Sequence, residues 1–149
     1  MGAVQNKSKP NRLRPLRGEG LGSGAFTGMP VRSSLVDLGR AGEKTAAELL
    51  KRRGYEVVGT GFRARRGELD LICRRGADLV VVEVKTRTDD SFGTPAEAVG
   101  SRKRRALMAA AAEYRALAGW RGTIRYAIVG LTANKEGAFD AELIEDPFQ

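Results

Sequence analysis

The 149-residue sequence contains no histidine and a single cysteine, Cys73. Without histidine the protein cannot use a Ser-His-Asp triad, a Cys-His pair or a His-ligated zinc site. A single cysteine excludes an internal disulfide and a Cys-x-x-Cys metal site, and it is typical of a reducing compartment, so we expect a cytoplasmic location. Any bound metal must then be held by oxygen ligands, which favours Mg²⁺ or Mn²⁺ over zinc or copper.

The sequence also lacks a long apolar run. No stretch approaches the length that spans a membrane, and the N-terminal segment has no apolar core of a signal peptide. We therefore expect no membrane partner. Hydrophobic residues make up 42% of the chain and charged residues 30%, so most of it is expected to fold, and its length suits one domain.

Positive charge is concentrated near the N-terminus. The chain has 26 Lys and Arg against 18 Asp and Glu, a net charge of +8, of which +5 falls in residues 1–34. This segment is rich in Gly, Ser, Pro and Asn, so we predict a disordered basic tail at 1–34 and a single folded domain at 35–149. Met29 is an alternative start of the chain. The positive charge favours anionic partners, of which nucleic acid is the commonest.

The pattern of the folded part predicts an α/β protein. Helical spacing of apolar residues begins at Asp37, the expected N-cap, and a second long helix is expected at 101–118, after a short helical piece at 95–99. Strand patterns cover 55–60, 68–73, 79–86, 123–131 and 139–144. The order αβββαββ does not alternate strictly, so we expect a central mixed β-sheet flanked by helices rather than a doubly wound parallel sheet.

Charged residues inside the predicted central strands need an explanation. Residues 79–82 are continuously apolar, as in a strand covered on both faces, yet Glu83 and Lys85 follow directly. If residues 76–77 form a type II′ turn, Asp70 lies opposite Glu83 on a neighbouring strand roughly 4.8 Å away. Two adjacent carboxylates repel each other, and a divalent cation relieves that repulsion and activates water. Lys85 would orient the water or stabilise charge on a phosphate, so this group suits phosphodiester hydrolysis.

A structural interpretation of the same residues is also open. Glu68 and Lys85 would then form a cross-strand ion pair on a solvated hairpin face. The apolar character of the strand favours function, because charges in central strands are rarely unused. Strand alternation places Asp70 on one face with Glu68 and Ile72. On the opposite face it places Leu69, Leu71 and Cys73, so the cysteine is expected in the core.

Two basic clusters lie close to these carboxylates, namely Arg63, Arg65 and Arg66 before the second strand and residues 102–105 at the start of the long helix. Arg87 extends the face of Lys85 if that strand continues. A phosphate at the start of the long helix would meet both the helix dipole and the basic side chains. These residues are candidate nucleic-acid contacts, and a solvated basic surface is the alternative.

Several motifs of the chain strongly resemble the YraN family. They are LGRAGE at 38–43, RGELDLI at 66–72, VEVKTR at 82–87 and FGTPAEAV at 92–99, followed by Lys103. Members of this family are small bacterial proteins regarded as endonucleases, distantly related to archaeal Holliday junction resolvases within the PD-(D/E)XK nuclease superfamily. The resemblance covers about residues 35–131.

The resemblance implies a restriction-endonuclease-like core and a metal-dependent endonuclease that acts on DNA, including branched or junction DNA. It implies that Asp70, Glu83 and Lys85 form the catalytic core and that Glu43 reaches the same Mg²⁺ or Mn²⁺ site. From the pattern alone, Glu43 is an ordinary carboxylate near a helix start. Glu68 falls in the family motif Gly-Glu-x-Asp. We expect it to orient the metal ligands without binding the metal itself, and to pair with Lys85.

The resemblance also bears on partners. The family pattern has a basic residue at Lys103, which makes it the expected phosphate contact on its helix. By analogy with junction resolvases, we expect a homodimer. The alternative function is a nucleic-acid-binding protein that keeps a nuclease fold without cutting.

The chain departs from the family at two positions. Family members commonly have Asn where Gly61 stands, and they tend to carry Asp where this chain has Ala127. If the missing carboxylate contributes to metal binding or to the fold, activity here would be weakened.

Overall fold

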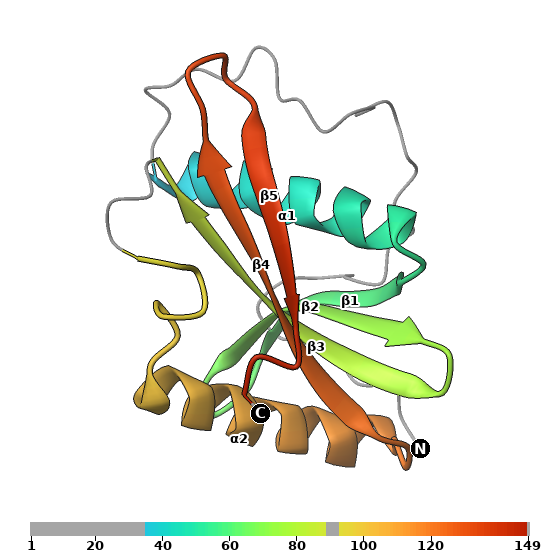
Figure 1. Ribbon diagram of the computed structural model, residues 1–149. Coiled ribbons are helices and arrows are strands. Elements are labelled where there is room, and N and C mark those ends of the chain that lie inside the picture. The colour runs from blue at the N-terminus through green and yellow to red at the C-terminus, as the bar shows by residue number, and fades with distance from the viewer. Residues whose placement is uncertain (1–34, 89–92, 149) are drawn as a thin grey trace.

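The computed structural model describes residues 35–88 and 93–148 (Figure 1). The elements follow one another as α1 (Leu35–Arg52), β1 (Glu56–Arg63), β2 (Glu68–Arg75), β3 (Asp78–Arg87), α2 (Ser101–Ala118), β4 (Ile124–Ala133) and β5 (Phe139–Glu145). The predicted tail at 1–34, with Met29, lies outside the described residues. Neither helix of the described part is long and apolar enough to cross a membrane.

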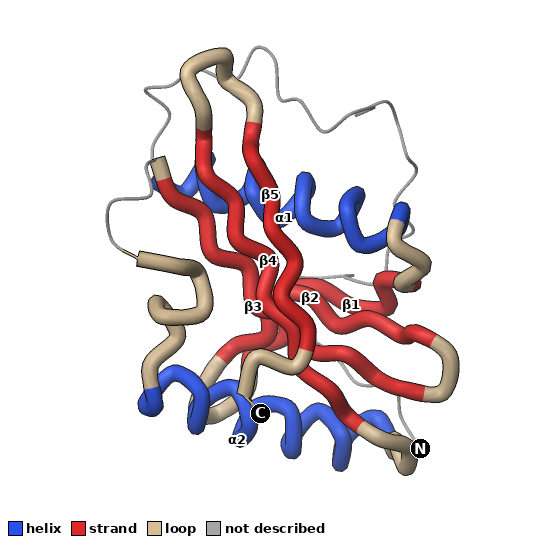
Figure 2. The backbone as a smooth tube through the Cα atoms, in the orientation of Figure 1, coloured by secondary structure: helices blue, strands red, loops and turns tan. Residues whose placement is uncertain are grey.

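The five strands form one mixed sheet in the order β1-β2-β3-β4-β5. β3 and β4 run parallel, with α2 in the connection between them, and the other three pairs are antiparallel. α1 and α2 pack on opposite faces of the sheet (Figures 1 and 2). The expected mixed sheet flanked by helices is therefore confirmed.

Each helix covers one hydrophobic core. On the α1 face, Leu50 packs in a buried cluster with Cys73 and Leu131, which confirms Cys73 as a core residue. On the α2 face, the buried cluster includes Leu107 and Ile128. The apolar run 79–82 divides alternately between the two cores and is buried throughout. β3 is thus a central strand covered on both faces.

The hairpin between β2 and β3 has the predicted register. Arg75 pairs with Asp78 across Gly76 and Ala77, and the pairing continues to Leu71 and Val82. Gly76, the first central residue of the turn, has a φ of 62°. Among the described non-glycine residues only Asp146 has a positive φ, so the second central residue, Ala77, does not. A positive φ at the first central residue alone is the signature of a type II′ turn.

The ladder between β2 and β3 ends one step before the expected Asp70–Glu83 pair. If this register continued, the N–H of Val84 would donate to the carbonyl of Leu69. It donates instead to Asp70 Oδ2, at 2.9 Å. The Asp70 carboxylate therefore replaces a backbone acceptor at the point where the two strands separate.

Leu69 does not follow the predicted alternation. It was expected to share a face with Leu71 and Cys73, but it packs in the α2-side core with Phe62 and Ile72. Beyond Leu71, β2 is no longer paired with β3 and keeps only its pairing with β1, in which Leu69 lies opposite Phe62. The alternation is therefore broken between Leu69 and Leu71, at the point where β2 leaves β3.

The short helical piece expected at 95–99 is a turn. The N–H of Thr94 donates to Glu97 Oε1 at 3.0 Å, and the N–H of Glu97 donates to Thr94 Oγ1 at 3.1 Å. This reciprocal pairing is the capping box of a helix start. The helix does not extend because Gly100 is extended before α2 begins. The Pro95 ring packs closely on Gly130 of β4, since a Cβ added to Gly130 would lie 2.1 Å from Pro95 Cγ.

A close approach between α1 and β3 fixes where the first turns of α1 lie. A Cβ on Gly42 would come within 2.1 Å of Thr86 Oγ1 and 3.2 Å of Thr86 Cβ. Only a glycine lets the helix backbone pass this near to the strand. The contact holds the neighbouring Glu43 beside the end of β3.

Gly42→Ala should destabilise the fold by about 1–3 kcal/mol, because the added methyl group overlaps Thr86 and forces the helix away from β3. Gly39→Ala is the matched control, since a Cβ at Gly39 meets nothing within 4 Å. In a helix interior that change should stabilise by roughly 0.5–1 kcal/mol. Urea unfolding of both variants checks this, and equal effects would contradict the close approach.

Candidate functional site

A cavity of about 330 Å³ opens where β2 separates from β3. It is lined by Leu38, Gly39, Glu43, Asp70, Glu83, Val84, Lys85 and Thr86. Three elements, α1, β2 and β3, therefore contribute to one site. All four residues predicted as the catalytic and metal-binding group, Glu43, Asp70, Glu83 and Lys85, lie on this wall.

Asp70 is held rigidly at the strand separation. Its Oδ2 accepts the Val84 N–H. Burial raises the pKa of the Asp70 carboxyl, and the nearby charge of Glu68 adds to the rise, whereas the Val84 hydrogen bond and the charge of Lys103 oppose it. The group is thus a fixed carboxyl whose ionised form any added positive charge would stabilise.

Glu83 is the most deeply buried carboxylate of this cavity, at 4% exposure. Its Oε2 lies 3.4 Å from Lys103 Nζ, and its Oε1 is buried without a hydrogen-bond partner in the described part of the chain. Burial, followed by the charge of Asp70, raises the pKa of Glu83 to about 7, against the opposing effects of Lys103 and Lys85. A buried carboxylate oxygen without a partner is costly and marks a place where a cation would stabilise the structure.

The donor set fits a hard divalent cation. Asp70 and Glu83 supply carboxylate oxygens from neighbouring strands, and Mg²⁺ is commonly bound by one or two carboxylates together with waters and substrate phosphates. Within residues 35–88 and 93–148, no three Asp, Glu or Cys side chains are grouped closely enough to hold a metal ion. Glu43 shares the cavity with the other two carboxylates, but its place as a third ligand stays a prediction.

Lys85 and Glu68 flank the two carboxylates differently. Lys85 lines the cavity, half-buried, and its charge lowers the pKa of Glu83. Glu68 is not among the lining residues and pairs with Arg63 in the β1–β2 ladder. Its charge acts on Asp70, which is compatible with a supporting position. The expected ion pair between Glu68 and Lys85 stays a prediction.

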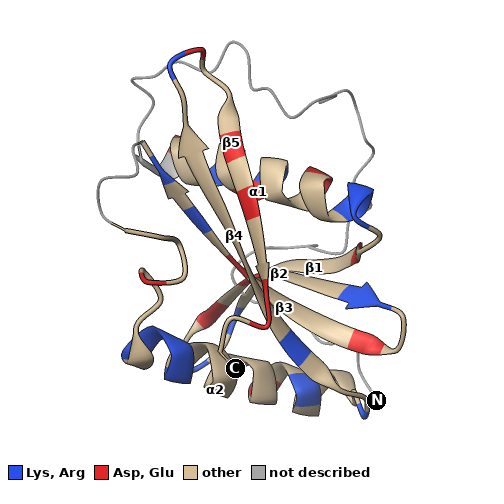
Figure 3. Cartoon of the chain, viewed as in Figure 1, with Lys and Arg blue, Asp and Glu red and all other residues tan. Residues whose placement is uncertain are grey.

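The first basic cluster lies at the end of β1 and on the connection from β1 to β2. Arg63, Arg65 and Arg66 are exposed. The connection is fixed to α2 by a hydrogen bond from the Arg65 N–H to Glu113 Oε1, at 3.0 Å. Lys and Arg also gather at the N-terminal end of α2 (Figure 3). Both basic clusters are therefore anchored to the same helix.

Two residues predicted to contact DNA have protein partners in the structure. Arg87 donates through Nη1 to the carbonyl of Gly93. Lys103 lies against Glu83 inside the candidate site. Neither contact was predicted from the sequence, because residue spacing does not determine the path of the chain between β3 and α2.

The two departures from the family pattern have structural explanations. Gly61 has a φ of 63°, in the left-handed region that Gly and Asn adopt most readily, so either residue satisfies the backbone there. Ala127 is 2% exposed and packs in the α1-side core. It does not line the cavity of Asp70 and Glu83, so the absence of a carboxylate there removes nothing from that wall.

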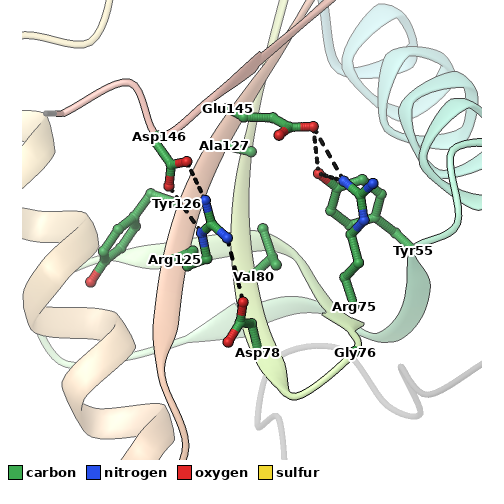
Figure 4. Close-up of a pocket in the computed structure, with 10 residues that line it drawn as sticks. All are labelled: Tyr55, Arg75, Gly76, Asp78, Val80, Arg125, Tyr126, Ala127, Glu145 and Asp146. Atoms are coloured by element: carbon green, nitrogen blue, oxygen red, sulfur yellow. Dashed lines mark hydrogen bonds and ion pairs between the residues drawn. The ribbon is translucent and has the colours of Figure 1, made fainter.

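A second cavity, of about 350 Å³, lies by the β2–β3 turn (Figure 4). Arg125 contacts Asp146 at 3.1 Å and Asp78 at 3.5 Å. Arg75 donates to the Tyr55 hydroxyl at 3.0 Å and contacts Glu145 at 3.3 Å. Sequence reasoning missed this network because most of its partners are far apart in the chain. Its two arginines pair with three carboxylates within it, so it ties the hairpin to the end of β5.

Glu83→Gln should make the metal-free protein more stable at high pH. The folded protein keeps the Glu83 proton up to a pKa of about 7, whereas the unfolded chain loses it near 4.5, so stability falls as pH rises between these values. The variant lacks this loss and should gain about 3 kcal/mol relative to the native protein between the two limits. Urea unfolding below and above this window tests the prediction.

The exposed Glu142→Gln is the matched control and should show no such pH dependence. A stability difference between Glu83→Gln and the native protein that stays constant with pH would contradict the buried, proton-holding state of Glu83.

Comparison with known proteins agrees with the sequence motifs. Residues 42–140 match the family described as "Uncharacterised protein family UPF0102". A UPF0102 protein of Symbiobacterium thermophilum is 40% identical over 112 residues, which cover 74% of this chain and 95% of the relative. One from Chlorobium chlorochromatii is 34% identical over 121 residues, covering 78% and 94%. The matched region contains Glu43, Asp70, Glu83 and Lys85, and the chain belongs to the uncharacterised protein family UPF0102.

Proposed function

We propose that the protein is a metal-dependent endonuclease of the PD-(D/E)XK type, which hydrolyses phosphodiester bonds of DNA, including branched or junction DNA. The observation that carries this proposal is the cavity in which Asp70 and Glu83 meet beside Lys85. The buried Glu83 Oε1 without a hydrogen-bond partner in the described residues adds a place for a cation. The mixed sheet with a helix on each face is compatible with a restriction-endonuclease-like core.

Asp70 and Glu83 would hold Mg²⁺ or Mn²⁺, and Glu43 on the α1 side of the cavity would complete the ligand set. The cation supplies a Lewis acid for a phosphoryl oxygen and lowers the pKa of water. The Val84 N–H keeps the Asp70 carboxylate in one orientation. The Lys85 ammonium would orient the attacking water or stabilise the negative charge that develops on the phosphate.

The basic residues around the site would bind the DNA backbone. Arg63, Arg65 and Arg66 are exposed on a connection fixed to α2, and Arg87 lies at the end of β3. Contacts of this kind bind phosphates and carry little sequence information. We expect a homodimer by analogy with junction resolvases, and a cytoplasmic location from the cysteine content.

The second candidate function is binding of nucleic acid without cleavage. It is favoured by one observation, the ion pair in which Lys103 already neutralises part of the acidic group. If this pair is permanent, the site holds no cation and the basic clusters alone remain functional. The two candidates differ in whether cleavage depends on Asp70 and Glu83.

Asp70→Asn and Glu83→Gln should each lower the rate of Mg²⁺-dependent DNA cleavage by about 100-fold or more, because each removes a negative ligand from the cation. DNA binding in Ca²⁺ should be largely retained, since the basic clusters are unchanged. Cleavage is measured on linear, flapped and branched DNA, with the exposed Glu142→Gln as the matched control. A native protein that binds but cuts none of these substrates would overturn the nuclease proposal and support the second candidate.

A further inference from the structure

Lys103 forms an ion pair with Glu83, one of the two carboxylates of the candidate site. Its Nζ lies 3.4 Å from Glu83 Oε2, and its side chain is 42% exposed whereas that of Glu83 is 5% exposed. Lys103 is the third residue of α2, so it reaches the site from the opposite face of the sheet to α1. Lys85 acts on Glu83 through its charge, whereas the lysine within ion-pair distance of Glu83 is Lys103 on α2.

The charge of Lys103 acts on both carboxylates. It favours the ionised forms of Asp70 and of Glu83, against the cost of burying two negative charges together. In the metal-free site its ammonium therefore stabilises the ionised carboxylates, as a divalent cation would do more strongly. The Glu83 Oε1 oxygen is still left without a hydrogen-bond partner in the described residues, so this neutralisation is incomplete.

A divalent cation and Lys103 would compete for the same negative charge. A cation held by Asp70 and Glu83 would repel an ammonium only a few ångströms away. Lys103 has the means to leave, because its head is partly exposed and its four-carbon stem is flexible. Three exposed arginines, Arg102, Arg104 and Arg105, lie beside it at the start of α2, and Arg104 also donates to the carbonyl of Phe148. A DNA phosphate is therefore the anion expected nearby.

We propose that Lys103 exchanges partners in this site: it neutralises Glu83 while the divalent cation is absent, and it binds a DNA phosphate once the cation holds Glu83. The inference rests on the proposed function, since it requires both a cation at Asp70 and Glu83 and a nucleic-acid substrate. It makes Lys103 a phosphate-binding residue whose contribution depends on the metal, unlike that of the exposed Arg102 on the same helix.

The first test measures Mn²⁺ affinity by calorimetric titration without DNA, above the pH at which Glu83 holds its proton. Lys103→Met should bind Mn²⁺ about three- to tenfold more tightly than the native protein, because the ammonium no longer competes. Lys103→Arg keeps the charge and should stay close to the native affinity. Arg102→Met is the matched control for lost helix charge and should change the affinity little, since Arg102 is exposed and has no ion pair with Glu83.

The second test measures binding of a fluorescently labelled DNA duplex in EDTA and in Ca²⁺. Lys103→Met should bind like the native protein in EDTA, where the lysine is engaged by Glu83, and about fivefold or more weakly in Ca²⁺, where a phosphate contact is lost. Arg102→Met should weaken binding by the same factor in both conditions. Circular dichroism confirms that each variant is folded.

Unchanged or weaker Mn²⁺ affinity in Lys103→Met would overturn the exchange, as would an equal loss of DNA affinity in EDTA and in Ca²⁺. These failures are distinct from failure of the proposed function. If the native protein itself binds no Mn²⁺ at Asp70 and Glu83, the metal-dependent nuclease is wrong, and the exchange falls with it.

Discussion

The separation of β2 from β3 at Asp70 is the feature on which the candidate site depends. Up to Leu71 and Val82 the two strands are paired through backbone hydrogen bonds, and one step later the Asp70 side chain takes the Val84 N–H. A carboxylate in this position is fixed by the sheet itself. The separation also leaves a cavity, which Glu43 of α1 and Lys85 of β3 line together with Asp70. A ladder that continued through Asp70 and Glu83 would close this space.

Burial of two neighbouring carboxylates in this site costs electrostatic free energy, and the surrounding structure offsets only part of that cost. Glu83 is almost fully buried next to a second carboxylate, and its pKa is raised to about 7. Lys103 and Lys85 oppose this rise from two different elements. Strain of this kind is typical of sites that bind an ion, because a cation would stabilise charges that the fold alone holds poorly. The second cavity is different, since its arginines and carboxylates pair with one another.

Local signals in the sequence were sufficient for a large part of this structure. The two-residue turn at Gly76 and Ala77 set the register that brings Asp70 towards Glu83, and the long helix at 101–118 was predicted with its observed ends. The side of Leu69 was not predictable, because the sequence pattern does not show where β2 leaves β3 and the alternation breaks. The contact between Lys103 and Glu83 was also missed, because it depends on where the crossover helix packs rather than on any spacing in the chain. Motif resemblance, not periodicity, placed Glu43 at the site.

The central claim is that Asp70 and Glu83 together form a binding site for a divalent cation. Anomalous diffraction from a crystal of the protein soaked in Mn²⁺ tests it most directly, because the signal locates the ion without reference to activity. The account predicts one strong peak between the carboxylates of Asp70 and Glu83, with Lys103 turned away from Glu83. A crystal in which this position holds no peak at saturating Mn²⁺, with the ion pair of Lys103 and Glu83 intact, would contradict it.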